Sequence, residues 1–245
     1  MWDKPAALNM LADLLFVAAL LGVLYAGVTY AVRLPAFTIN GIRVATPLEH
    51  VTRAQIEELV RREVRGTFFT LNLASARAAF ERLPWVRSAD VRRQWPGGLE
   101  IVLTEHVPLA RWGKDALVNI HGEVFEAAFD GALPVFNGPA GAAKEMTIQY
   151  NHFRRSLAAI GKTPGEINVS PRRAWQIQMD DGVTLDLGRE HVEERLRRFV
   201  ATYPRTIARM SHPVDRVDLR YANGFAARVP GLPPAADGTR PKRGV

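Results

Sequence analysis

The chain has 245 residues, which is enough for one large domain or two small ones. It holds no cysteine, and this excludes disulfides, cysteine-ligated zinc and thiol nucleophiles. The net charge of +7 comes from basic residues scattered among Asp and Glu, without a Lys/Arg stripe interleaved with aromatic residues. The composition therefore does not support nucleic-acid binding.

A run without charged residues near the amino terminus, residues 14–32, predicts a transmembrane helix. As a helix, these nineteen residues would span about 28 Å, close to the roughly 30 Å hydrocarbon core of a bilayer. No face of the run is polar, which disfavours the buried helix of a soluble domain. A cleaved signal peptide is the alternative, although its apolar region is usually shorter and no clear Ala-x-Ala site follows. The flanking charges do not decide the orientation.

Residues 37–105 predict an α+β module in which two helices pack on one face of a small sheet. An opening strand begins the module, and its apolar positions, interrupted at Gly41, are Phe37, Ile39, Ile42 and Val44. Thr52 and Gln55 fit a capping box at the start of the first helix, and Asn72 fits the cap of the second.

Two strands follow these helices, because the apolar period changes to two after residue 84. The turn between them is Pro96-Gly97-Gly98. Arg93 breaks the apolar alternation of the first strand, so we expect it at the margin of the sheet.

Residues 106–230 predict a mostly antiparallel β domain with two helices. Apolar residues recur at helical spacing over 146–160 and over 192–200. Short strands are indicated within 117–125, which reads as a hairpin, and within 133–139.

Two further hairpins are marked by their turns, Asp181-Gly182 and Asn223-Gly224. These dipeptides tolerate the positive φ angles of a type I′ turn. From residue 231 to residue 245 the chain is Pro, Gly and basic residues without periodicity, which predicts a disordered tail.

Local motifs for catalysis are missing from the sequence. No two of the six histidines have the spacing that puts two metal ligands on one helix face. A G-x-S-x-G elbow, a P-loop and a G-x-G-x-x-G motif are all absent. We therefore predict no catalytic residue, cofactor or metal site, although a triad assembled in space remains open.

The ordered elements resemble the FtsQ/DivIB family of bacterial cell-division proteins. The stretch LPWVRSADVRRQWPGGLEIVLTEHVPLARW resembles part of the family's POTRA domain. Four further stretches resemble its β domain in the right order: VNIHGEVFE, LPVFNGP, LGREHVEERLRRFVATYP and VDRVDLRYANGFAARV. The resemblance runs from the anchor to about Val229, and it implies a POTRA domain at 37–105 and a β domain at 106–230.

The resemblance also implies a location and a function. Residues 1–13 would lie in the cytoplasm, one helix would cross the inner membrane, and the soluble part would lie in the periplasm at the division septum. The protein would be a non-enzymatic divisome scaffold that binds FtsB and FtsL and thereby recruits the septal peptidoglycan synthesis machinery. Other division proteins would bind through the POTRA domain and the transmembrane helix.

In this family the terminal strands and the preceding helix form the docking surface for FtsB–FtsL. The resemblance carries this role to six positions, which are Arg189, Tyr221, Asn223, Gly224, Phe225 and Val229. Arg189 would pair with an acidic partner group. Val229 stands where the family often has an aromatic residue, so we expect a shallower or differently filled pocket there. The residue pattern alone favours core positions for Tyr221 and Phe225, because they continue the apolar face of the preceding strand.

Two alternatives stay open. The first is an exported enzyme of unknown reaction whose signal peptide resembles a membrane anchor. The second is an outer-membrane secretion component, since POTRA modules also occur there. The chain lacks the many alternating strands of a membrane barrel, which disfavours this second alternative.

Overall fold

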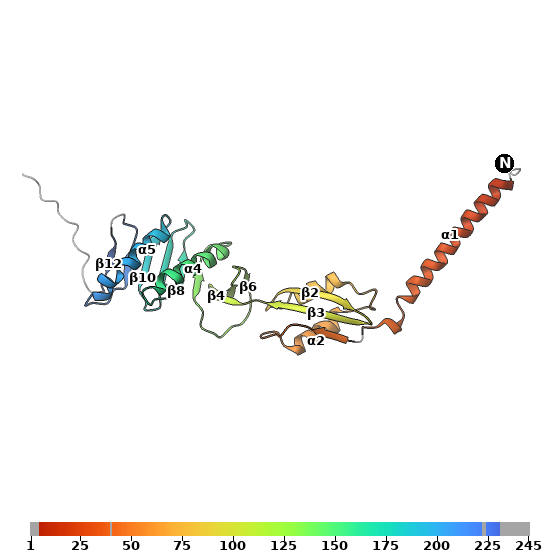
Figure 1. Cartoon of the computed structure of the whole chain (residues 1–245), viewed down its shortest axis with the longest axis horizontal. Helices are drawn as coiled ribbons and strands as arrows, with labels where there is room; N and C mark the ends of the chain where they lie inside the picture. Colours follow the sequence, from red (N-terminus) through yellow and green to blue (C-terminus); the bar gives the residue numbers. More distant parts are fainter. Residues whose placement is uncertain (1–4, 40, 222–223, 231–245) are drawn as a thin grey trace, which may run out of the picture. The chain divides into compact units, whose positions relative to one another are not determined.

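The computed structural model describes residues 5–39, 41–221 and 224–230. The chain divides into two compact units, Met1–His106 and Val107–Val245, and Figure 1 labels several of their helices and strands. The tail predicted over 231–245 lies outside the described residues.

The first unit begins with the long helix α1, Pro5–Ala31. Its 27 residues correspond to about 40 Å of helix. The segment Asn9–Ala31 is long and apolar enough to cross a membrane, and none of it is buried inside the structure. The predicted run of 14–32 therefore falls within one continuous helix except for its last residue, Val32.

The rest of the first unit is a three-stranded sheet with two helices. The sheet has the order β1-β3-β2, in which β2 and β3 are antiparallel and β1 is parallel to β3. The bounds of these elements are β1 Gly41–Val44, α2 Arg53–Glu63, α3 Leu73–Phe80, β2 Val86–Gln94 and β3 Gly98–Glu105. The buried core between sheet and helices includes Ile56, Phe80, Leu99, Ile101 and Leu103.

The opening strand is shorter than predicted, because Phe37 and Ile39 lie outside it. Phe37 ends the 3-10 helix η1, Pro35–Phe37, and its backbone N–H donates to Leu34 O at 3.1 Å. Its carbonyl accepts from Phe68 N at 2.7 Å, so its backbone groups are used outside the sheet. Apolar residues there pack without joining a strand, and only the residues from Gly41 onward pair with β3.

Both predicted helix caps are confirmed. The Thr52 hydroxyl accepts from Gln55 N at 3.3 Å, and Gln55 Oε1 accepts from Thr52 N at 2.9 Å, which is the reciprocal capping box. Asn72 Oδ1 accepts from Ala74 N at 3.0 Å and from Ser75 N at 3.1 Å. These bonds satisfy N–H groups that a helix start leaves without partners.

The second unit is built on one nine-stranded sheet of order β12-β11-β10-β9-β8-β7-β4-β5-β6. Among the described residues, five of its pairings are antiparallel and three are parallel. The first strands are β4 Pro108–Trp112, β5 Ala116–Asn119, β6 Val124–Phe125, β7 Val135–Asn137 and β8 Pro164–Val169. The later strands are β9 Trp175–Met179, β10 Thr184–Gly188, β11 Arg216–Asp218 and β12 Ala226–Arg228.

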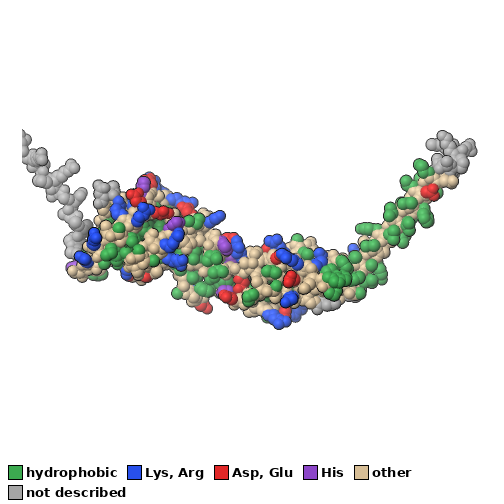
Figure 2. All heavy atoms as spheres, viewed as in Figure 1, with side chains coloured by type: hydrophobic (Ala, Val, Ile, Leu, Met, Phe, Trp, Pro, Cys, Tyr) green, Lys and Arg blue, Asp and Glu red, His purple; other side chains and the backbone are tan. Residues whose placement is uncertain are grey.

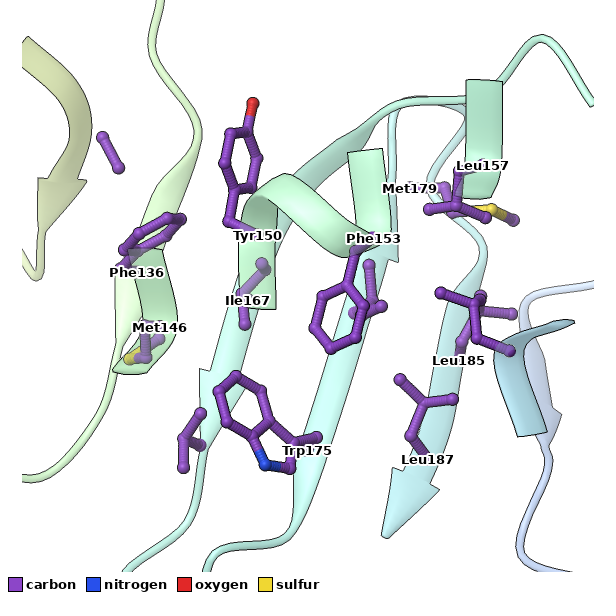
Figure 3. Close-up of a cluster of buried hydrophobic side chains, with 14 of the residues drawn as sticks. Phe136, Met146, Tyr150, Phe153, Leu157, Ile167, Trp175, Met179, Leu185 and Leu187 are labelled. Atoms are coloured by element: carbon purple, nitrogen blue, oxygen red, sulfur yellow. The ribbon is translucent and has the colours of Figure 1, made fainter. Parts of the chain in front are cut away.

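Helices α4, Ala143–Ala158, and α5, Val192–Thr202, pack on this sheet. Figure 3 shows Tyr150, Phe153 and Leu157 of α4 meeting side chains of the strands beneath. The buried side chains of this core include Phe136, Ile167, Ile177, Leu185 and Phe199. Two 3-10 helices, η2 Tyr203–Arg205 and η3 Ile207–Arg209, lead from α5 towards β11.

The Asp181-Gly182 hairpin is present, but its turn differs from the prediction. Only Gly182 has a positive φ, +86°, while a type I′ turn needs positive φ at two residues. Gly182 N donates to Met179 O at 3.0 Å, and Met179 N donates to Val183 O at 2.9 Å. The loop is therefore one residue longer, and Asp181 helps to close it by accepting from Val183 N at 3.1 Å.

Candidate protein-interaction surface

Strand β12 forms one edge of the nine-stranded sheet. It pairs with β11 in antiparallel register, and within the described part of the chain no strand pairs with its other side. Its three residues, Ala226, Ala227 and Arg228, are all exposed. An edge of this kind presents backbone N–H and C=O groups to which a strand of another polypeptide can bind.

The pairing pattern indicates which backbone groups face the open side. Thr184 N donates to Asp215 O at 2.9 Å and Leu219 N donates to Asp186 O at 2.9 Å, so Val217, which lies between these bonds in β11, directs its backbone groups towards β10. The pair Val217 and Ala227 is then of the type without hydrogen bonds between its members. The N–H and C=O of Ala227 consequently face away from β11.

Tyr221 and Phe225 flank the turn that joins β11 to β12, and they have different surroundings. Tyr221 is 57% exposed, so the core position favoured by the residue pattern is wrong for it. Phe225 is half-buried and packs against the core, with its ring 6.1 Å from that of Phe199 at an angle of 77°. The predicted core position is therefore partly correct for Phe225, because its side chain packs against the core but is not fully buried.

The other positions near this turn are less defined. Gly224 and Val229 are half-buried. Asn223 lies outside the described residues.

Helix α5 supports the backbone that presents Tyr221. Arg198 Nη2 donates to the carbonyl oxygen of Tyr221 at 2.8 Å. On the same helix, Arg195 Nη1 donates to the carbonyl of Leu187 at 2.7 Å, near the end of β10. These two arginines therefore tie α5 to the strands beside the edge.

Arg189 lies at the same end of the sheet as Tyr221. Strands β10 and β11 are parallel, with Asp186 opposite Asp218, and a Cβ on Gly188 would lie 3.2 Å from Cγ of Arg220. Arg189 follows the last residue of β10, and Tyr221 lies three residues beyond the end of β11, so both leave the sheet at the same end. The Arg189 side chain is 69% exposed, and its Nε lies 3.2 Å from Glu190 Oε1. An exposed ion pair of this kind is weak, so its guanidinium can exchange partners readily.

Arginine–aspartate pairs fix the strands behind the edge. Arg220 Nη2 donates to Asp218 Oδ2 at 2.6 Å and Arg220 Nε to Asp218 Oδ1 at 2.9 Å. These hydrogen bonds hold the pKa of Asp218 below its usual range, against the opposing effect of burial. Arg216 Nη2 donates to Asp186 Oδ1 at 2.8 Å, which links β11 to β10. The pairing of Arg216 with Asp186 has no signal in the sequence, because the two residues are 30 positions apart in the chain.

Comparison with known proteins gives consistent matches over both units. The family described as "POTRA domain, FtsQ-type" matches residues 37–106. The family described as "Cell division protein FtsQ/DivIB, C-terminal" matches residues 110–220. The second match includes Arg189 but ends before Tyr221.

Individual relatives extend the similarity over nearly the whole chain. A protein of Nitrosospira multiformis named "Cell division protein FtsQ" is 45% identical over 93% of this chain and 99% of its own length. Proteins of the same name from Burkholderia pseudomallei and Neisseria gonorrhoeae are 40% and 33% identical, each over 95% of this chain. They are covered over 96% and 98% of their own lengths.

Proposed function

Because the chain belongs to the FtsQ/DivIB family of cell division proteins, we propose that it is a non-enzymatic divisome scaffold. Its partners are FtsB and FtsL, and through them it recruits the septal peptidoglycan synthesis machinery. Its surface for these partners is the β12 edge together with Tyr221, Phe225 and Arg189.

One observation carries this proposal, namely that β12 is the outermost strand and has one free side within the described part of the chain. A segment of FtsB adds to that side as a further strand. Backbone hydrogen bonds supply affinity in such a complex, and side chains at alternate positions supply specificity. The exposed Tyr221 gives the aromatic contact that often dominates binding energy.

Helix α1 anchors the scaffold in the inner membrane, with residues 1–13 in the cytoplasm and both folded units in the periplasm. The length and apolar composition of α1 support the membrane anchor, and the orientation rests on the family resemblance. Anchoring raises the local concentration of the scaffold for partners held in the same membrane, so a modest affinity suffices. The intact mass of the membrane-extracted protein tests the anchor, since cleavage of a signal peptide would remove about thirty residues.

The binding surface is tested by Tyr221→Ala in the full chain, purified in detergent and titrated with purified FtsB–FtsL complex. We expect about tenfold to hundredfold weaker binding, as for the loss of an aromatic anchor. The matched control is Ile148→Ala, which removes a side chain of similar exposure, 52%, from helix α4. Equal affinity of the folded Tyr221→Ala protein and the unsubstituted protein would contradict the assigned surface.

A further inference from the structure

Four aromatic rings gather at the end of the first unit that adjoins α1. The Phe37 and Phe69 rings lie 5.1 Å apart, the Phe68 and Phe69 rings 5.2 Å apart, and the Phe68 and Trp95 rings 5.8 Å apart. All three contacts are edge-to-face, the arrangement that aromatic pairs prefer. We call this group of Phe37, Phe68, Phe69 and Trp95 the aromatic end.

Two of these rings are turned outward. Trp95 is 71% exposed and Phe69 is 44% exposed, while Phe68 beneath them is buried. Both exposed rings contact the buried Phe68 ring, and exposed apolar side chains grouped in this way cost free energy in water, so they indicate a contact surface.

The backbone that carries these rings is held firmly. Arg93 Nε donates to Phe68 O at 2.5 Å, and Arg93 Nη2 donates to Leu71 O at 2.7 Å. This is why Arg93 interrupts the apolar alternation of β2, since its side chain fixes the loop that presents Phe69.

The aromatic end is also joined to the end of the apolar helix. Thr67 Oγ1 donates to the carbonyl of Val32, the residue that follows α1, at 2.6 Å. Phe68 N donates to Phe37 O, and Thr38 forms a bridge with Thr67. Figure 2 shows hydrophobic side chains at the place where α1 meets the body of the unit. Phe37 thus follows the end of α1 by six residues, and the loop that carries Phe68 and Phe69 is hydrogen-bonded to the end of α1 through Thr67. The aromatic end therefore lies close to the point at which the helix leaves the bilayer.

The three segments that carry the aromatic end hold only basic charges. The segments 32–39, 65–71 and 93–98 contain Arg33, Arg65 and Arg93 and no acidic residue. Arg33 and Arg65 are exposed. Aromatic rings with arginines are the composition that favours the headgroup region of a bilayer, where rings are partly solvated and lipid phosphates are anionic.

We propose that the aromatic end binds the membrane surface itself, with Phe69 and Trp95 inserted among the lipid headgroups. The headgroup layer on each side of a bilayer is about 5–8 Å thick, which matches contacts made directly beside the end of a spanning helix. This contact would fix how the first unit stands on the membrane. The proposal rests on the anchoring of α1 given above, and the experiment separates the two.

The test uses nitroxide labels on single cysteines, because the chain has none of its own. Labels are placed at Gln94→Cys beside Trp95, at Thr104→Cys near the other end of the same β2–β3 hairpin, and at Ala19→Cys within α1. The full chain is reconstituted into lipid nanodiscs, once with zwitterionic lipid and once with added anionic lipid. The accessibility of each label to oxygen, which concentrates in lipid, is compared with its accessibility to a water-soluble nickel chelate.

We expect the label at 94 to be lipid-accessible and the label at 104 to be water-accessible. Adding Trp95→Ala should move the label at 94 towards water, and anionic lipid should move it deeper. If the labels at 94 and 104 are equally water-accessible while that at 19 is in lipid, the proposal is wrong and the anchor stands. A water-accessible label at 19 would overturn both the membrane anchor and the proposed membrane contact of the aromatic end. Spin–spin broadening at 94 would show that a second copy covers the aromatic end, which also overturns the proposal.

Discussion

Arg198 in α5 donates a hydrogen bond to the backbone carbonyl of Tyr221, which follows the last residues of β11. The bond joins a helix to a loop 23 residues later in the chain. Because Tyr221 itself is exposed, its position depends on backbone support of this kind rather than on packing of its ring. Arg198 is thus a positioning residue for the proposed partner surface.

We expect Arg198→Ala to weaken FtsB–FtsL binding by several-fold and to lower the free energy of unfolding by about 1 kcal/mol, because one hydrogen bond from a charged donor is lost. Titration with the partner complex and thermal unfolding measure the two effects. The control is Arg197→Ala, which removes an exposed arginine from the adjacent position. Binding losses of equal size in both variants would mean that charge alone matters.

Ala227→Pro tests the open edge directly. Proline has no N–H, and the N–H of Ala227 faces away from β11, so the internal pairing should survive while the partner strand loses a donor. We expect weaker partner binding with little change in melting temperature. In contrast, Ala226→Pro removes an N–H directed at β11 and should lower the melting temperature as well. Unchanged affinity for the folded Ala227→Pro protein would show that strand addition does not occur there.

Gly188 is required at the end of β10, because its φ is +72° and a Cβ would approach Arg195 Nη1 to 2.9 Å. We expect Gly188→Ala to lower the free energy of unfolding by about 1–2 kcal/mol, since an L residue is strained in this region. The adjoining Arg189 should shift and reduce partner affinity. Gly165→Ala is the control, because nothing lies closer than 3.7 Å to its added Cβ. Equal stability of the two variants in thermal unfolding would contradict this account.

Glu105 provides a pH dependence in the first unit. Its carboxylate accepts from the backbone N–H groups of Glu49 at 3.0 Å, His50 at 3.1 Å and Val51 at 2.7 Å. Burial raises the pKa of Glu105, but these bonds outweigh it and lower its pKa overall. The stabilisation is therefore complete above the unfolded pKa of about 4.3, and it is lost as the pH falls through the lower folded pKa.

Accordingly, Glu105→Gln should cost about 1–2 kcal/mol at neutral pH, and the cost should shrink in acid as the unsubstituted carboxylate becomes protonated. Hydrogen exchange of the β2 and β3 amides measures this for the first unit within the full chain. Glu63→Gln, on the exposed end of α2, serves as the control. A cost that stays constant from neutral to acidic pH would exclude the ionised carboxylate as its source.

Signals that depend on neighbouring residues predicted the local structure well. The caps at Thr52 and Asn72 involve residues two or three positions apart, so they can be found in the sequence. The parallel pairing of β1 with β3 joins Gly41 to Gly98, and no local pattern encodes it. Strand β8 was not predicted, because it begins with Pro164 and Gly165, residues that are typical of turns, and only two apolar residues follow them. In the structure Glu166 Oε1 accepts from Asn137 Nδ2 at 2.9 Å on the neighbouring strand.

The proposed partner surface likewise depends on contacts between distant residues, which local sequence patterns do not encode. Alternation placed Tyr221 with Val217 and Leu219, but β11 ends at Asp218, and beyond that residue alternation no longer determines which side faces the core. The resemblance to the family, and no residue pattern, implies a role for Tyr221 and Arg189. Their positions at one end of neighbouring parallel strands come from the register of β10 and β11, which sequence periodicity does not contain.

The sheet order also bears on which substitutions affect partner binding. Strand β12 pairs within the described residues only with β11, and β11 reaches its place beside β10 through the α5 crossover. The backbone of the proposed partner edge is therefore held only through β11 in this part of the chain, and β11 in turn is held by β10. A substitution that loosens β11 from β10 should consequently weaken partner binding even when it lies outside the surface that the partner contacts.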